Sequence, residues 1–225
     1  EWSRGLGDVY KRQTYVSSTI RAHRYEILIM RRRIKHRPPR VTPRNRIWQI
    51  DLTGKPTRES PRQSLLGLID HGTRACVGLA ALPRKTTLRI LITLLEAMDR
   101  FGVPRAIRTD NEAVFTSRWF RIGLWLLGIR HQRIDYHCPW QNGRIERMFL
   151  TLKQSLDRLD FADINALNRH LGTWRLWYNY VRPHQQLDGR VPAEVWDGTT
   201  VTRPTKRPLW FEDETGLLRG YYVPK

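Results

Sequence analysis

The order of the apolar segments between residues 46 and 181 restricts this chain to few folds. Three short strand-like runs come first: RIWQIDLT (46–53), SLLGLID (64–70) and RACVGLAAL (74–82). Gly72, between the second and third runs, predicts a hairpin. Strand-like and helix-like segments then alternate, which is typical of an α/β sheet flanked by helices. The predicted order is therefore β-β-β-α-β-α-β-α-α, an antiparallel start followed by alternation.

The first predicted helix is TLRILITLLEAMDRFG, where Gly102 ends the segment. Its apolar residues recur at helical spacing, at Leu88, Leu91, Ile92, Leu95 and Met98. The other predicted segments are strands at 106–110 and 130–134, and helices at 117–129, from about Gly143, and at 163–181. The tail PLWFEDETGLLRGYYVPK predicts two short strands joined by a turn at Glu214-Thr215-Gly216.

The charge balance indicates a polyanionic partner. The chain has 40 Lys and Arg against 21 Asp and Glu, a net charge of +19. Residues 1–46 hold 13 basic and 3 acidic residues, a net of +10, which leaves 27 and 18, a net of +9, for the rest. Such an excess favours binding to nucleic acid over a basic surface that is merely solvated.

A basic, proline-rich segment, RRRIKHRPPRVTPRNR (31–46), predicts an extended linker. Arg31, Arg32 and Arg33 are its candidate DNA contacts, and a solvated tail is the alternative. The first residues, EWSRGLGDVYKRQ (1–13), resemble translated adaptor sequence and are left out of the fold prediction.

Composition also argues against several classes of site. The two cysteines, Cys76 and Cys138, are separated by 138 − 76 − 1 = 61 residues, too sparse for a disulfide framework or a cysteine zinc site. That pattern suits a reducing cytoplasm. No apolar run approaches the ~20 residues of a membrane span. We therefore expect a cytoplasmic protein that does not contact a membrane.

Three acidic residues stand out by their positions. Asp51 lies inside the first strand, Asp110 ends the fourth, and Glu146 begins a helix after a glycine loop. Carboxylates that converge at one edge of a sheet repel each other unless a cation compensates them. Mg²⁺ prefers oxygen ligands, and two such ions act on both the attacking and the leaving oxygen at phosphorus. The alternative for any one acid is a surface residue, a cap or an ion-pair partner.

The helix after residue 143 gives Glu146 a particular place. Glu146 lies at the edge of an apolar stripe that comprises Ile145, Met148, Phe149, Leu152, Leu156 and Leu159. Arg144 and Arg147 are predicted to face solvent, and Lys153 to point the same way as Glu146. The carboxylate is therefore expected at the rim of the core.

These residues together resemble a known family. Asp110 and Glu146 are separated by 146 − 110 − 1 = 35 residues, and Asp51 lies in WQIDLT. This resembles the Asp-Asp-35-Glu triad of retroviral-type integrases and bacterial insertion-sequence transposases. The segments RTDNEAVFTS, CPWQNGRIERMFLTLK and WYNYVRPHQQLDGRVPAEVW follow in the order of that family. The resemblance covers about residues 44–197.

The resemblance implies a ribonuclease-H-like α/β fold with a mixed five-stranded sheet. It makes Asp51, Asp110 and Glu146 the catalytic residues and the ligands of two Mg²⁺ or Mn²⁺ ions, with Asp51 shared between them. The implied reaction cleaves mobile-element DNA ends and joins their 3′-hydroxyls to target DNA. The implied DNA contacts are Lys153, Gln141, Asn142, Gly143 and Arg144. The family also implies a homo-oligomer on DNA, associated with the bacterial nucleoid.

The resemblance divides the chain into four segments: a basic arm (1–43), a catalytic core (44–160), a C-terminal helix with an Arg-Pro-His segment (161–198), and the start of a β-rich tail (199–225). One departure is Glu112, where the family usually has glycine; it adds negative charge near the acids. Two other functions remain open: a DNA-binding relative without catalysis, and a nuclease of the same fold that only hydrolyses.

Overall fold

The computed structural model describes residues 13–35, 42–135, 139–198 and 207–223. The chain forms two compact units, Glu1–Val41 and Thr42–Lys225. In the described part of the first unit, residues 13–22 are helical and α2 spans Arg24–Lys35. The extended linker predicted from residue 31 is therefore wrong for 31–35. The helix-forming residues of MRRRIK decide the conformation there, because the prolines come only afterwards.

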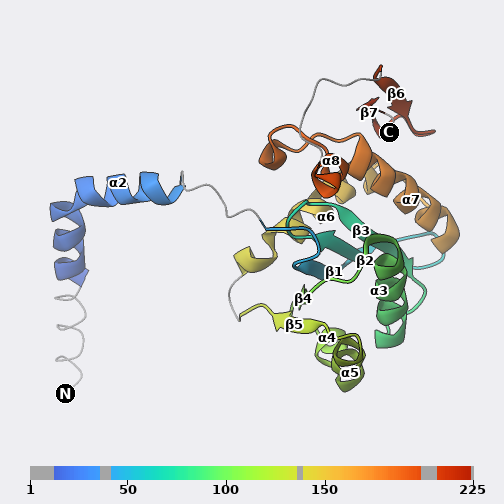
Figure 1. Cartoon of the computed structure of the whole chain (residues 1–225), viewed down its shortest axis with the longest axis horizontal. Helices are drawn as coiled ribbons and strands as arrows, with labels where there is room; N and C mark the ends of the chain where they lie inside the picture. Colours follow the sequence, from blue (N-terminus) through green and yellow to red (C-terminus); the bar gives the residue numbers. More distant parts are fainter. Residues whose placement is uncertain (1–12, 36–41, 136–138, 199–206, 224–225) are drawn as a thin grey trace. The chain divides into compact units, whose positions relative to one another are not determined.

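The second unit is built on a five-stranded mixed sheet (Figure 1). Its strands are β1 (Trp48–Lys55), β2 (Gln63–Asp70), β3 (Cys76–Leu82), β4 (Ala106–Thr109) and β5 (Arg130–Arg133). They lie in the order β3-β2-β1-β4-β5. β2 pairs antiparallel with β1 and β3, whereas β4 pairs parallel with β1 and β5. The predicted mixed five-stranded sheet is confirmed.

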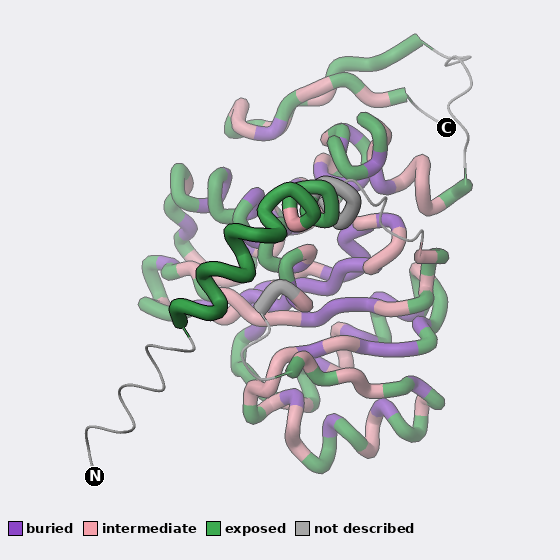
Figure 2. The backbone as a smooth tube through the Cα atoms, turned by 90° about the vertical axis from the view of Figure 1, so that its left-hand side faces the viewer, coloured by how far each residue is buried: buried purple, intermediate pink, exposed green. Residues whose placement is uncertain are grey.

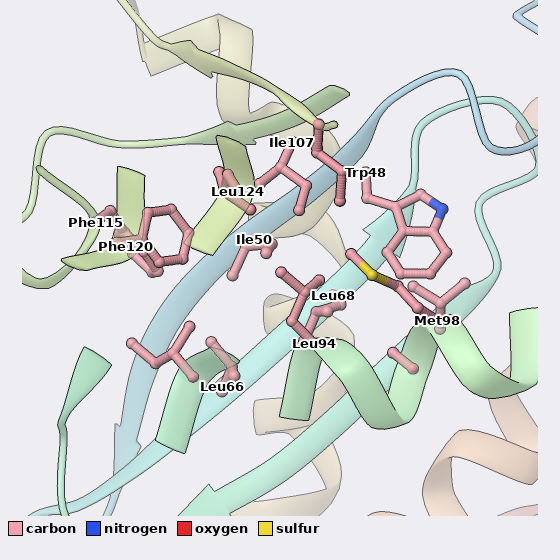
Figure 3. Close-up of a cluster of buried hydrophobic side chains, with 14 of the residues drawn as sticks. Trp48, Ile50, Leu66, Leu68, Leu94, Met98, Ile107, Phe115, Phe120 and Leu124 are labelled. Atoms are coloured by element: carbon pink, nitrogen blue, oxygen red, sulfur yellow. The ribbon is translucent and has the colours of Figure 1, made fainter. Parts of the chain in front are cut away.

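One face of the sheet is covered by α3 (Thr87–Phe101), α4 (Ala113–Thr116) and α5 (Arg118–Leu126). Their buried side chains pack against Trp48 and Ile50 of β1 and Ile107 of β4 in one core cluster (Figure 3). Burial of this apolar surface is the main force that holds the layer in place. Figure 2 shows the sheet as the most deeply buried part of the chain.

The other face packs against α6 (Gly143–Leu156) and α7 (Ile164–Tyr180). The stripe predicted for α6 is confirmed for five of its residues, which are all buried: Ile145, Met148, Phe149, Leu152 and Leu156. The sixth, Leu159, lies beyond the end of the helix and is half-buried. The helix approaches β2 closely because Gly67 has no side chain. A Cβ at that position would lie 2.6 Å from Cε1 of Phe149.

The stripe predicted for α3 is only partly right. Met98 is buried, but Leu88 and Leu95 are 67% and 47% exposed, and the buried residues also include Ile90 and Leu94. The segment is apolar around most of its circumference, so spacing alone does not select the face that meets the sheet.

The chain after α7 continues through two short helices that were not predicted, η2 (Gln185–Leu187) and α8 (Pro192–Asp197). The short helix α4, which follows β4, was not predicted either. The predicted terminal hairpin is present as β6 (Leu209–Glu212) and β7 (Arg219–Tyr222). It is anchored by the buried Leu218 and by the Trp177 indole, which donates a 3.1 Å hydrogen bond to the Arg219 carbonyl. No described helix is long and apolar enough to cross a membrane.

Candidate active site at the edge of the sheet

Strand register brings Asp51 and Asp110 to the same level. In the parallel pair β1 and β4, Gln49 lies opposite Arg108. Asp51 and Asp110 each follow two residues later, so continuation of the register places the acids opposite each other where β4 ends. Side chains alternate along a strand, and Asp51 pairs with Gly67, which faces α6. Asp51 therefore lies on the α6 face of the sheet and is half-buried, less deeply than its place inside a strand suggested.

The segment before α6 is tied to β1 by side-chain amides. The short helix η1 covers Pro139–Asn142, and its Gln141 carbonyl accepts a 2.7 Å hydrogen bond from Nε2 of Gln49. Nδ2 of Asn142 donates to Oδ2 of Asp51 at 3.4 Å. These two contacts fix the start of α6 next to Asp51, and Glu146 lies in the first turn of that helix.

The acidic side chains are close enough for their charges to act on Asp51. Burial raises the pKa of Asp51 to about 7, and the charges of Asp110, Glu146 and Glu112 add to the rise. The Leu52 N–H, 2.8 Å from Oδ1 of Asp51, opposes it. Burial also raises the pKa of Asp110. The charge of Lys85 opposes this rise at Asp110, and several carboxylates near one another are the environment that a divalent ion stabilises.

The chemistry of this edge fits Mg²⁺ or Mn²⁺, which bind carboxylate and amide oxygens. Oδ1 of Asn142 and Oε1 of Gln49 are buried acceptors without a hydrogen-bond partner in the described part of the chain. The same part contains no group of three or more His, Cys, Asp or Glu side chains arranged to hold a metal. Glu146 is exposed, so its convergence with the two aspartates stays a prediction.

A second charge pair borders the acids. The ammonium of Lys85, in the turn between β3 and α3, forms an ion pair with the carboxylate of Glu112. The backbone N–H of Glu112 donates to Oδ1 of Asp110 at 3.0 Å. Glu112 was predicted as an added charge, but its ion pair with Lys85 was not. No local sequence pattern indicates this contact, because 27 residues separate the two partners.

Two further acids, Asp70 and Asp135, are hydrogen-bonded to neighbouring groups. Asp70 is fully buried at the end of β2, and its carboxylate accepts hydrogen bonds from the backbone N–H groups of Asn45, Gly72 and Thr73. Asp135 accepts a 2.8 Å hydrogen bond from Nε2 of Gln141. The Asp70 carboxylate thereby organises the β2–β3 turn, as a short polar side chain commonly does.

The predicted DNA contacts lie in different surroundings. Gly143 and Lys153 are exposed on α6, and Arg31 is exposed on α2; the side chains of Arg32 and Arg33 lie outside the described residues. Gln141 is bound to Asp135, and Asn142 is only 4% exposed beside Asp51. For all of these residues, contact with DNA stays a prediction.

Arg144 is the exception to the predicted orientation. It does not face solvent: its side chain is half-buried and Nη1 donates to the His71 carbonyl. Burial lowers the pKa of Arg144 to about 10, and the charges of Arg74 and Arg108 contribute. The helical wheel did not show this contact, because the β2–β3 turn that Arg144 meets is 73 residues away in the sequence.

Comparisons with known proteins agree with the fold and with the segments on which the site rests. Two family models, both described as Integrase core domain, match residues 42–139 and 127–192. Together they span the sheet, α6 and all of α7, and therefore every candidate acid. The chain belongs to the integrase core family.

Among relatives of this integrase core is an uncharacterized 39.2 kDa protein of insertion element IS476 from Xanthomonas euvesicatoria. It is 29% identical over 168 residues, which are 74% of this chain and 48% of the relative. An uncharacterized 31.7 kDa protein of insertion element IS407 from Burkholderia multivorans is 27% identical over 67% of this chain and 54% of its own length. The chain thus spans about half the length of these curated relatives.

Solved structures share the fold of this integrase core. A chain in the cryo-electron microscopy structure of the simian T-cell lymphotropic virus intasome, in complex with PP2A regulatory subunit B56 gamma, has a TM-score of 0.58 at 20% identity. That match covers 84% of this chain and 72% of the other. The HTLV-2 integrase catalytic core domain in complex with magnesium has a TM-score of 0.52 at 20% identity, over 70% and 99% of the two chains. The ribonuclease-H-like fold is confirmed.

The YNYVRPH segment of this integrase core stabilises the packing of α7. Asn179 binds both backbone groups of Cys76, donating to its carbonyl at 2.9 Å and accepting from its N–H at 2.8 Å. His184 is 8% exposed and packs edge-on against the Tyr178 ring, with centroids 4.7 Å apart. The segment therefore joins α7 to β3 through Asn179, and α7 to the turn after it through His184.

We expect His184→Ala to destabilise the second unit by about 2 kcal/mol, since it removes a buried ring and leaves a cavity against Tyr178. Activity should fall together with stability. Urea unfolding of this variant beside Gln186→Ala, an exposed neighbour, provides the measurement and the control. Full stability with lost activity would instead assign His184 to substrate contact.

Proposed function

We propose that this integrase core acts in a DNA transposase that cleaves mobile-element ends and joins their 3′-hydroxyls to target DNA. The observation that carries the proposal is the placement of three acids. Asp51 and Asp110 lie level on adjacent parallel strands, and Glu146 is close enough for its charge to raise the pKa of Asp51. Membership of the integrase core family supports the same chemistry.

The proposed roles of the residues follow from their positions. Asp51, Asp110 and Glu146 would hold two Mg²⁺ or Mn²⁺ ions. When bound, the ions supply the Lewis acidity that activates an attacking oxygen and stabilises a leaving oxygen at phosphorus. Asn142 holds Oδ2 of Asp51, and the Glu112 N–H holds Oδ1 of Asp110, so both carboxylates keep fixed orientations.

DNA binding in this proposal comes from the basic surface. Lys153 is exposed seven residues after Glu146, so both side chains project from one side of α6. The net charge of +19 provides the general attraction for phosphates. We also propose a homo-oligomer on DNA that is associated with the bacterial nucleoid; the dimeric and trimeric forms of the HTLV-2 integrase catalytic core domain, which has a similar fold, support the oligomer.

The test is a cleavage and joining assay with duplexes that carry the matched ends of the element, in Mg²⁺ and in Mn²⁺. Joined products support the proposed reaction. Nicked products alone would show a nuclease that only hydrolyses. Binding without either product, in the presence of matched ends, would show a DNA-binding relative without catalysis.

Removal of the first unit should weaken the salt dependence of DNA binding. Residues 1–41 hold 11 basic and 3 acidic residues, a net of +8. The slope of log affinity against log salt is about −0.9 for each phosphate neutralised. We expect the slope for residues 42–225 to be shallower by about 0.9 for each of several lost phosphate contacts. Fluorescence anisotropy over a salt series measures it. An unchanged slope would show that the arm does not bind DNA.

A further inference from the structure

Three half-buried arginines lie near one another where the β2–β3 turn meets the start of α6. Arg74 lies in the β2–β3 turn, Arg108 on β4 and Arg144 in the first turn of α6. Nη1 of Arg74 and Nη1 of Arg144 both donate to the carbonyl oxygen of His71. Arg108 is close enough for its charge to act on Arg144 and on His71. Segments far apart in sequence thus place three positive charges together.

No acid in the described part of the chain forms an ion pair with any of the three. Asp70 is the nearest carboxylate whose charge acts on Arg74 and Arg144. It is fully buried, and its oxygens already accept hydrogen bonds from Asn45, Gly72 and Thr73. Like charges that are half-buried and unpaired are unfavourable in the free protein, unless an anion binds between them.

The backbone of Arg74 adds an independent observation. Its φ is 65°, a left-handed conformation that favours glycine or asparagine and is uncommon for a long side chain. The other described non-glycine residues with positive φ are Asn45 and Asp188, which tolerate it. An arginine kept in an unfavourable conformation points to a function for its side chain rather than to a role in the turn.

The location connects this cluster with the acids. Arg108 precedes Asp110 by two residues at the end of β4, so both side chains point to one face of the sheet, whereas Arg144 and Glu146, two residues apart on α6, point to different sides of that helix. Arg108 also lies opposite Gln49 of β1, whose side chain holds the segment before α6. The cluster and the two aspartates therefore share the α6 face of the sheet near the start of that helix.

We propose that Arg74, Arg108 and Arg144 form a phosphate-binding site that holds the DNA backbone where the β2–β3 turn meets α6, on the face of the sheet that also carries Asp51. Guanidinium groups bind phosphate through paired, charge-assisted hydrogen bonds. His71 presents the carbonyl that orients two of the three side chains. This inference rests on the proposed function for its ligand, a DNA strand, and it adds Arg74 and Arg108 to Arg144, which the resemblance already implied as a DNA contact.

The test uses Arg74→Gly in the full chain. Glycine relieves the left-handed backbone, so the midpoint temperature should stay unchanged or rise. The slope of log affinity for a fluorescein-labelled duplex against log salt should become shallower by about 0.9, and affinity should fall about tenfold. Arg121→Ala, which removes an exposed arginine, and Asp188→Gly, which places glycine at another left-handed position, should keep the wild-type slope.

Inorganic phosphate at constant ionic strength separates the two sources of the anion. A higher midpoint temperature for wild type but not for Arg74→Gly would show a site that also accepts free phosphate. A shallower DNA slope without that shift would assign the site to the DNA backbone alone. If Arg74→Gly keeps the slope and affinity of Arg121→Ala, the phosphate site is refuted. If Arg74→Gly shows the shallower slope but the wild-type chain does not cut DNA, the phosphate site stands and only the proposed catalytic function is contradicted.

Discussion

Glu146→Gln is expected to reduce both end cleavage and strand transfer to background while DNA binding persists. The amide keeps the shape of the side chain but removes the charge that would complete one metal ion. Loss of one transition-state electrostatic contact costs roughly 10²–10³ in rate, and loss of an ion at least as much. Because a negative charge near phosphate disappears, binding should be equal or slightly tighter. Cleavage under Mg²⁺ and anisotropy with the same duplex measure the two effects.

Glu112→Gly is the matched control for that experiment. It removes an acid at the same edge of the sheet but keeps the backbone N–H that donates to Asp110. It also releases Lys85 from its ion pair, which adds a positive charge near the DNA. We expect activity to stay intact or to rise. If Glu112→Gly is inactive while Glu146→Gln cuts normally, the metal site has been assigned to the wrong glutamate.

Asp51→Asn should abolish catalysis and yet stabilise the metal-free protein at alkaline pH. Burial and the neighbouring acids raise the pKa of Asp51 from 3.8 to about 7. Below pH 4 the residue is protonated in the folded and the unfolded chain, so it has no effect. Between pH 4 and 7 the unfolded chain loses the proton first, so stability falls as the pH rises. Above pH 7 Asp51 is ionised in both states, and its buried charge lowers the free energy of unfolding by the full amount.

The difference between Asp51→Asn and wild type should therefore grow from near zero at pH 4 to about 2–4 kcal/mol at pH 8. The asparagine Oδ1 can still accept the Leu52 N–H, so the fold should persist. Urea unfolding at several pH values measures the difference. At pH 8, Mg²⁺ should raise the midpoint temperature of wild type but not of the variant. A less stable variant at pH 8, or an equal Mg²⁺ shift in both, would contradict a metal role for Asp51.

Local signals determined the main elements of the second unit. The period of apolar residues and the turn residues predicted all five sheet strands and the long helices α3, α6 and α7 near their observed bounds. Spacing also identified the buried stripe of α6, because that helix is amphipathic and only one of its faces is apolar. The 35-residue spacing from Asp110 to Glu146 carried the family resemblance, which the family matches confirm.

Only the tertiary structure decided which polar side chains meet. Lys85 with Glu112 and Arg144 with His71 are separated by 27 and 73 residues, and no local pattern encodes such contacts. The face that α3 turns to the sheet was also undetermined, since that segment is apolar on most sides. Strand order brought Asp110 beside Asp51, and the same register brought Arg108 beside Gln49. Sequence therefore specified the chemistry of the candidate acids, whereas packing of α6 on the sheet brought Arg144 to the β2–β3 turn and created the arginine cluster there.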